Sequence, residues 1–449
     1  LNSLSPFYDE EPQGDLDLIR LRSKWSMEGR VEQRPIEMYD LEKSWKSSGL
    51  ALERFNQYGT MPVRGFFPIL GLKDKKEDVI WLTEFDARAS WQMNAARVYD
   101  RLVFFGGLPD RDNGNWFKLI DPGETYETPP TYLTVGNGNL LNVSQRLQKK
   151  TNKKLPIVYN EWGTSWGHPS EKLVNESISI LKKHAVDYYV IDAGWYKSKT
   201  DDFNDGMGDW KIDITKFPHG LKTVVDNIHG SGMKAGIWFE FEGLGKDSKN
   251  YYKKDMLIKR DNWPVTTLKR RFLNMRLPQV QNFIKERVID QLKGNGFDYL
   301  KIDYNDSIGI GADGDDSGAQ ELQNQITATL QTINKIYESV PHIIIENCSS
   351  GGHRMTPAFI ESTDLSSFSD AHETDSIPII AANELNVIPA SKNLIWCTIH
   401  PEDSKGYLQY HIISTYLGRI CMSGDIRNIS ETQWETIDAG INFYKKISD

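Results

Sequence analysis

Two aspartates that each close a short strand-like segment are the residues of this sequence best placed to do chemistry. Asp303 ends the segment 299–303, and Asp370 ends the segment 367–370. Two carboxylates in one cleft can cleave a glycosidic bond, because one attacks the anomeric carbon while the other protonates the leaving oxygen. A single aspartate at a strand end more often caps a helix or forms a turn. The interpretation therefore depends on the elements that position the pair.

Eight apolar segments alternate with amphipathic helical patterns from residue 155 onward, which is typical of βαβ units. The strand segments lie at 156–160, 187–192, 234–240, 297–303, 342–347, 365–369, 393–398 and 419–423. This number of repeats predicts a (β/α)8 TIM barrel, whose usual length is roughly 250 residues before insertions. The alternative is a doubly wound open sheet, but no Gly-x-Gly-x-x-Gly opens the first helix.

The carboxyl ends of barrel strands carry functional side chains, and here acids, tryptophans and a lysine meet at that edge. Six such ends at one mouth favour a shared site over separate structural roles. Lys301 and Asp303 are two residues apart in a strand, so they share a face, and the ammonium is expected to lower the pKa of Asp303. A surface ion pair is the structural alternative for Lys301. A buried core position is the alternative for Trp238.

The first part of the chain has a different pattern from the rest. Short alternating segments such as 79–83 and 97–105 are separated by turn residues such as those at 109–115, which predicts antiparallel β structure. The expected organisation is an N-terminal β-rich, sandwich-like domain at 1–145 and a catalytic barrel at 146–449. A polar helical stretch at 142–150 is expected to connect them.

Composition narrows the classes of partner and compartment. The 449 residues carry a net charge of −9, which disfavours nucleic acid and anionic membranes as partners and favours a small polar molecule. Three cysteines without metal-type spacing exclude a complete disulfide framework and predict a reducing, cytoplasmic compartment. No apolar run approaches the roughly 20 residues that span a bilayer. The first residue is Leu, so we expect a processed chain or a fragment, and export stays open.

The order of motifs resembles glycoside hydrolase family 36, the α-galactosidase family among the barrel α-glycosidases. The resemblance covers about residues 155–446. It is carried by Asp192-Ala193-Gly194-Trp195, Gly208-Asp209-Trp210, Lys216-Phe217-Pro218-His219-Gly220-Leu221, Gly236-Ile237-Trp238-Phe239-Glu240-Phe241-Glu242, Lys301-Ile302-Asp303-Tyr304-Asn305, Cys348-Ser349-Ser350-Gly351-Gly352 and Ser369-Asp370.

The resemblance implies a retaining exo-α-glycosidase that hydrolyses terminal α-linked galactose from oligosaccharides or glycoconjugates by double displacement. Asp303 matches the nucleophile and Asp370 the general acid/base, with carboxyl groups expected about 5–5.5 Å apart. The substrate-binding residues implied are Asp192, Trp195, Trp238, Glu240, Lys301, Asn305, Cys348 and Gly351. No metal or organic cofactor is implied.

The resemblance also bears on the rest of the chain and on its assembly. It implies that the N-terminal part is a shortened or truncated β-sandwich and that the family's C-terminal β domain is absent from this chain. Members of the family often form oligomers, so a homo-oligomer is an option.

One departure from the family pattern concerns the choice of sugar. Ala193 stands where the family has a second aspartate, so an axial 4-hydroxyl would have one acceptor fewer. Glu161 and Glu240 are candidate substitutes. The alternatives that stay open are an α-N-acetylgalactosaminidase, another α-glycosidase, or a transglycosylase with the same residues. From a different class, a non-catalytic carbohydrate-binding protein on a decayed barrel would be expected to have lost one of the two carboxylates, and both are present.

Overall fold

Eight parallel strands close into a barrel in the second part of the chain. The computed structural model describes the backbone of residues 2–8 together with residues 14–43, 45, 50–99, 101–149, 156–372 and 375–448. Each predicted strand segment contains one barrel strand, so the predicted (β/α)8 barrel is confirmed. In barrel order these strands are β10 (Val158–Asn160), β11 (Tyr188–Ile191), β12 (Lys234–Phe239), β18 (Tyr299–Ile302), β19 (Ile344–Asn347), β20 (Leu365–Ser367), β21 (Asn393–Thr398) and β22 (Arg419–Ser423).

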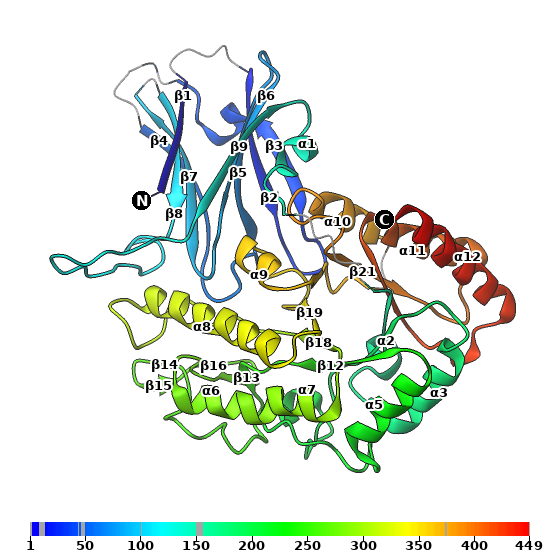
Figure 1. Cartoon of the computed structure of the whole chain (residues 1–449). Coiled ribbons are helices and arrows are strands. Elements are labelled where there is room, and N and C mark those ends of the chain that lie inside the picture. Colours follow the sequence, from blue (N-terminus) through cyan, green and yellow to red (C-terminus); the bar gives the residue numbers. More distant parts are fainter. Residues whose placement is uncertain are drawn as a thin grey trace.

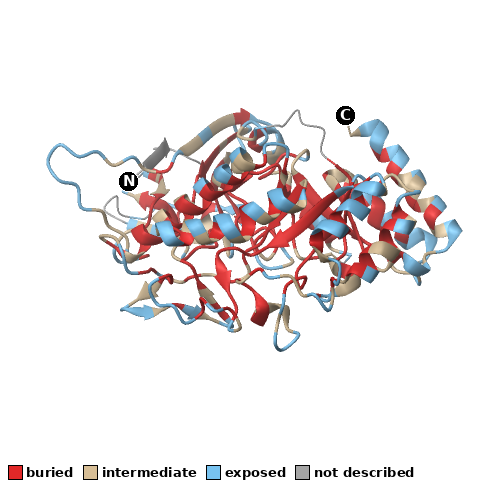
Figure 2. Cartoon of the chain, turned by 60° about the horizontal axis from the view of Figure 1, so that its bottom comes forward, coloured by how far each residue is buried: buried red, intermediate tan, exposed pale blue. Residues whose placement is uncertain are grey.

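Helices surround the barrel and bury the outer face of its strands, while side chains of the strands themselves fill the interior. Figure 2 shows the strands buried at the centre and the outer faces of the helices exposed. Serine side chains begin four of these helices, because each hydroxyl accepts a hydrogen bond from a backbone N–H of the first turn. The main helices are α3 (Glu171–Leu181), α5 (Gly220–Gly230), α6 (Pro278–Ile284), α7 (Asp290–Asn295), α8 (Gly318–Ser339), α9 (Pro357–Ser362), α11 (Lys405–Ser414) and α12 (Glu431–Ile447).

Some barrel elements could not be found from sequence periodicity. Helix α10 (Ile377–Glu384) is apolar almost all round, so it has no amphipathic period to detect. Between β12 and β18 lies a small sheet of β13 (Gly243–Leu244), β17 (Arg270–Phe272) and β16 (Thr266–Thr267), whose strands are too short to give an alternating pattern.

The first part of the chain forms two antiparallel sheets, which confirms the predicted N-terminal β domain. One sheet has the order β1-β8-β7-β4 and the other the order β3-β2-β5-β6-β9. Apolar side chains from both sheets, including Leu18, Phe55, Leu70 and Trp91, pack together as a core. The strands are β1 (Asn2–Tyr8), β2 (Leu16–Arg22), β3 (Arg30–Pro35), β4 (Leu50–Gln57), β5 (Phe66–Asp74), β6 (Val79–Phe85), β7 (Trp91–Val98), β8 (Arg101–Gly107) and β9 (Thr131–Asn137).

A short helix follows the last strand of this β domain. Helix α1 (Leu140–Ser144) overlaps the first residues of the connecting helix expected at 142–150 and ends at Ser144. Residue 150 lies outside the described residues. The division of the chain at residue 145 stays a prediction.

The β domain rests directly on the barrel (Figure 1). Asp86 accepts a hydrogen bond from the backbone N–H of Ala358 at 2.7 Å, in α9, and the Arg88 guanidinium donates to the Thr327 hydroxyl at 3.0 Å, in α8. The turn between β2 and β3, residues 23–29, lies against α10. An added Cβ on Gly29 would lie only 3.0 Å from the Cγ of Glu384, so this turn approaches the helix as closely as glycine permits.

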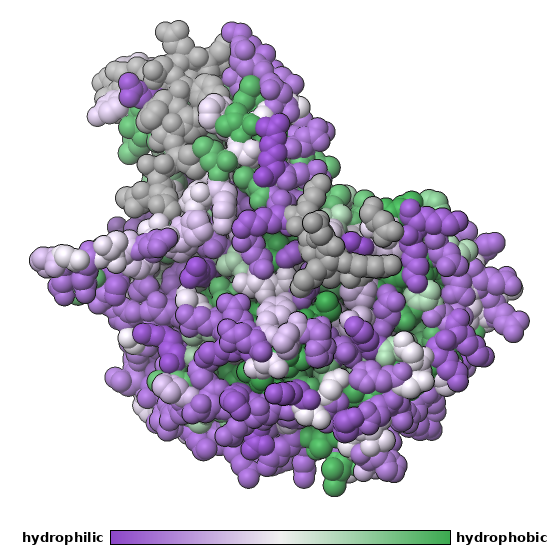
Figure 3. Space-filling view, in the orientation of Figure 1, coloured by the Kyte–Doolittle hydropathy of each residue, from purple (hydrophilic) through white to green (hydrophobic). Residues whose placement is uncertain are grey.

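The face of the molecule seen in Figure 3 is mainly hydrophilic, with apolar atoms in small separate groups. Among the described residues, no helix combines the length and the apolar character required to cross a bilayer.

Candidate active site

A cavity of about 260 Å³ opens at the carboxyl ends of the barrel strands. This volume lies just below the roughly 300–1,000 Å³ of most ligand pockets, which suits a ligand the size of one sugar unit. Polar groups and aromatic rings share the wall. The lining residues are Trp25, Trp162, Trp166, Asp192, Ala193, Phe203, Trp238, Lys301, Asp303, Asn305, Asp370, His372 and Trp396.

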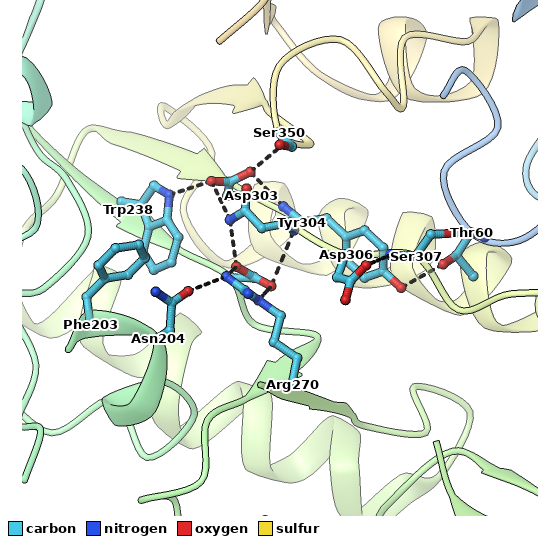
Figure 4. A network of polar contacts seen from close by, with 12 residues as sticks. Thr60, Phe203, Asn204, Trp238, Arg270, Asp303, Tyr304, Asp306, Ser307 and Ser350 are labelled. Carbon is cyan, nitrogen blue, oxygen red and sulfur yellow. Dashed lines mark hydrogen bonds and ion pairs between the residues drawn. The ribbon is translucent and has the colours of Figure 1, made fainter. Parts of the chain in front are cut away.

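Asp303 directly follows β18, and four donors from the barrel hold its carboxylate (Figure 4). One oxygen accepts from the indole N–H of Trp238 at 3.1 Å and the amide of Asn305 at 2.9 Å. The other accepts from the backbone N–H of Tyr304 at 2.8 Å and of Ser350 at 3.2 Å. Burial would raise the pKa of Asp303, but the Lys301 ammonium and these hydrogen bonds hold it below its usual value. The site therefore keeps Asp303 ionised.

Asp370 lies in the loop after β20 and shares a partner with Asp303. Its Oδ2 accepts from the Ser350 hydroxyl at 3.1 Å and from the indole N–H of Trp25 at 2.8 Å. Burial and the negative charge of Asp303 raise the pKa of Asp370. Ser350 thus bonds both carboxyl groups, whose pKa values are shifted in opposite directions. Such a pair can divide the roles of nucleophile and proton donor.

Lys301 and Asp192 form a buried ion pair beside these carboxylates. The Nζ to Oδ2 distance is 2.9 Å, and the Asn160 amide donates to the same oxygen at 2.7 Å. Burial lowers the pKa of Lys301, but the charge of Asp192 outweighs it and the pKa lies well above the usual value. The alternative of a surface ion pair is therefore wrong for Lys301. Its ammonium also lies 4.9 Å from the centre of the Trp396 ring.

Two residues expected to contact the substrate, Glu240 and Trp195, are fully buried beneath the cavity wall. Glu240 pairs with Arg270 at 2.7 Å and accepts from the Asn305 amide at 2.7 Å, so it orients Asn305. The indole N–H of Trp195 donates to the backbone carbonyl of Trp238 at 3.0 Å. Both thus lie behind the wall in this structure, and each supports a residue that lines the cavity.

Cys348 and Gly351 also lie behind the wall, in the loop that presents Ser350. Burial raises the pKa of the Cys348 thiol well above its usual value, so it stays protonated. Gly351 has a φ of +81°, and an added Cβ would lie 2.7 Å from the backbone nitrogen of Asp370. Only glycine fits this approach, which lets the loop press against Asp370 and reach both carboxyl groups.

Neither proposed substitute for the missing aspartate reaches the cavity. Ala193 lines the wall, while Glu161 is fully buried and accepts from the backbone N–H of Asp192 at 2.8 Å. Burial raises the pKa of Glu161 to about 8. The structure therefore gives no support to Glu161 or Glu240 as the substitute. Within the described part of the chain, the acids on the wall are Asp192, Asp303 and Asp370.

An aromatic wall was missed by the sequence analysis. The Trp162 ring lies 5.7 Å from Trp166 and 5.6 Å from Phe203, and the His372 ring lies 5.7 Å from Trp166 and 5.3 Å from Trp396. Trp162 follows a predicted strand end and could have been found by that position. Burial and the Lys301 charge lower the pKa of His372 to about 4, so this ring is neutral at neutral pH.

Comparison with known proteins places these features in a family. A family model described as Melibiase matches residues 131–449. "Alpha-galactosidase 1" of Pediococcus pentosaceus is 28% identical over 258 residues, which are 54% of this chain and 35% of that protein. "Alpha-galactosidase AgaA" of Geobacillus stearothermophilus is 23% identical over 97% of this chain and 61% of its own length.

A solved structure gives the same picture of the fold. A doubly substituted form of the GH36 α-galactosidase AgaA from Geobacillus stearothermophilus, in complex with raffinose, has a TM-score of 0.84. The two chains are 21% identical, and the match covers 99% of this chain and 62% of that one. The chain thus spans between about a third and three fifths of the lengths of these relatives.

Proposed function

This chain belongs to the Melibiase family, and from that membership we propose that it is a retaining α-glycosidase that removes terminal α-linked galactose from oligosaccharides or glycoconjugates. The observation that carries the proposal is the Ser350 bridge between two carboxyl groups whose pKa values are shifted apart. The names of the relatives and the raffinose complex of AgaA support galactose as the sugar.

In the first step, the Asp303 carboxylate attacks the anomeric carbon and forms a glycosyl–enzyme ester. The bond between that carbon and the leaving oxygen breaks, and Asp370 transfers its proton to this oxygen. The pKa directions fit these roles, since a nucleophile must be ionised and an acid must carry a proton.

In the second step, water attacks the same carbon while the Asp370 carboxylate accepts a proton from it. The ester bond to Asp303 breaks, which returns the carboxylate and releases the sugar with its original anomeric configuration. We assign binding of the sugar hydroxyls to Asp192 and Lys301, which line the cavity as a buried pair. Trp238 and Asn305 hold Asp303 and form the wall around it.

A panel of nitrophenyl glycosides tests the assignment. We expect the α-galactoside to be hydrolysed with the highest kcat/KM, compared with the α-glucoside and the α-N-acetylgalactosaminide. Proton NMR of early time points should show the α-anomer of the sugar first, as retention requires. Hydrolysis of none of the panel would contradict the proposed activity, and a first-formed β-anomer would contradict the double displacement.

Ala193 supports a second candidate, an α-N-acetylgalactosaminidase, because its methyl group lines the cavity where the family pattern has a carboxylate. A smaller side chain frees space beside the sugar, and the loss of one acceptor weakens the selection for galactose at its 4-hydroxyl. The same panel separates the two candidates, since this one requires the α-N-acetylgalactosaminide to be the best substrate.

Replacement of Lys301 by glutamine is expected to move the acidic limb of the pH profile of kcat/KM toward higher pH. Activity rises as Asp303 loses its proton, and the ammonium that holds the pKa of Asp303 down would be gone. Lys234→Gln, at the amino end of the neighbouring strand β12, is the matched control and should leave the limb in place. An unmoved acidic limb in the Lys301 variant would show that this lysine does not set the ionisation of the nucleophile.

A homo-oligomeric state and a cytoplasmic location also stay proposals. Sedimentation of the purified protein and fractionation of the source cells would test them.

A further inference from the structure

We propose that Glu28, in the N-terminal β domain, is a positioning residue for Asp370 and acts through the hydroxyl of Ser369. This inference rests on the proposed function, in which Asp370 is the acid/base. Glu28 lies in the turn between β2 and β3 and is fully buried where that turn meets the barrel. The Ser369 hydroxyl donates to Oε2 of Glu28 at 2.6 Å, across 341 positions of the chain.

Ser369 is held from two sides, which fixes the backbone around Asp370. Its hydroxyl also accepts from the backbone N–H of Ala371 at 3.1 Å. Residues 369 and 371 flank Asp370, so a tight bond from Glu28 to this hydroxyl restrains the short segment that carries the acid. Loss of the Glu28 carboxylate would leave a buried hydroxyl without its acceptor and allow the segment to shift.

The turn that carries Glu28 is itself anchored. The backbone N–H of Ser26 donates to Oε1 of Glu28 at 3.1 Å, so both oxygens of this carboxyl group have a donor. Val31 donates from its backbone to the Asn383 side chain of α10 at 3.3 Å. Trp25, one residue before Ser26, donates directly to Asp370. The turn therefore holds the acid in two ways, directly through Trp25 and indirectly through Glu28.

Glu28 lies close to other acidic groups. Burial raises its pKa to about 7, and the charge of Asp370 adds to this rise. Glu384 of α10 is fully buried close by, and burial, with the charge of Glu28, raises its pKa well above the usual value. The hydrogen bond from Ser369 opposes the rise in the pKa of Glu28, as do backbone donors of its own turn. The contact with Ser369 thus stabilises the carboxylate and joins it to the barrel.

The test compares two substrates that differ in their need for protonation of the leaving group. Glu28→Ala is expected to lower kcat/KM about 10- to 100-fold for methyl α-galactoside, which depends on the acid, because general acid catalysis is sensitive to the geometry of proton transfer. For dinitrophenyl α-galactoside, whose leaving group departs without a proton, the change should be less than about threefold. Glu28→Gln keeps a polar partner for Ser369 and should restore most of the loss.

Controls separate positioning from a general effect on folding. The quantity compared is kcat/KM for methyl α-galactoside divided by kcat/KM for dinitrophenyl α-galactoside. Met27→Ala changes an exposed side chain of the same turn and should leave this ratio unchanged. Ser369→Ala removes the same bond from the barrel side and should lower the ratio as Glu28→Ala does, even where the latter folds poorly. Equal losses on both substrates in these variants would overturn the positioning role. Failure of the unmodified enzyme on both galactosides would instead overturn the proposed function.

Discussion

Asp303→Ala is expected to lower turnover of nitrophenyl α-galactoside by on the order of 10⁴- to 10⁶-fold, the range found when a covalent nucleophile is removed. The four donors that now bond this carboxylate would face the sugar without any group able to form the ester. Binding should persist, because Asp192 and Lys301 still line the cavity. Steady-state kinetics measures the loss, and calorimetry with galactose measures the retained binding.

The same strand provides the control for this prediction. Asp298 lies at the amino end of β18, where it accepts from the backbone N–H of Ala235 at 3.1 Å and contacts the His229 ring at 2.8 Å. Asp298→Asn should keep turnover within a few-fold while lowering the free energy of unfolding by about 1–3 kcal/mol. Turnover in the Asp303 variant close to that of the Asp298 variant would place the nucleophile elsewhere.

Asp370→Ala is expected to lower kcat/KM by about 10²- to 10⁴-fold for galactosides with poor leaving groups, since the proton donor of the first step would be gone. The loss should be much smaller for dinitrophenyl α-galactoside. Because the second step then lacks its base, the glycosyl–enzyme should accumulate, and added azide should raise kcat by attacking it without proton transfer. Product analysis would show a galactosyl azide of α configuration.

Asp364→Asn is the matched control for Asp370, because it lies just before β20 while Asp370 lies just after it. Asp364 accepts from the Tyr337 hydroxyl at 2.6 Å and from the backbone N–H of Ile345 at 3.0 Å. Its variant should affect stability and leave the dependence on the leaving group unchanged. A loss in Asp370→Ala that is equal for both classes of substrate would remove this residue from the role of acid.

The barrel and the placing of Lys301 beside Asp303 could be predicted from the sequence for physical reasons. Parallel barrel strands are buried on both faces, so they form apolar segments that stand out between amphipathic helices. Residues two apart in a strand point the same way, so the spacing alone predicts an ammonium beside Asp303. The structure agrees, with both side chains on the cavity wall.

The sequence could not show which strand-end side chains line the cavity and which lie behind them. Position at a strand end brings a residue to the mouth of the barrel, but packing decides whether it lines the cavity. Trp195 and Glu240 are at such ends and support Trp238 and Asn305 from behind. The contact of Trp25 with Asp370 spans 345 positions and joins two domains, so no local pattern could reveal it.

The turn at 23–29 makes the two proposed catalytic carboxyl groups depend on different parts of the polypeptide. The four donors to the nucleophile described above come from the barrel, whereas the proton donor is completed by an indole from the β domain. In a chain whose barrel had closed before this turn docked, Asp303 would be ionised while Asp370 would lack its hydrogen bond from Trp25. Docking of the turn thus completes the set of hydrogen bonds that hold Asp370.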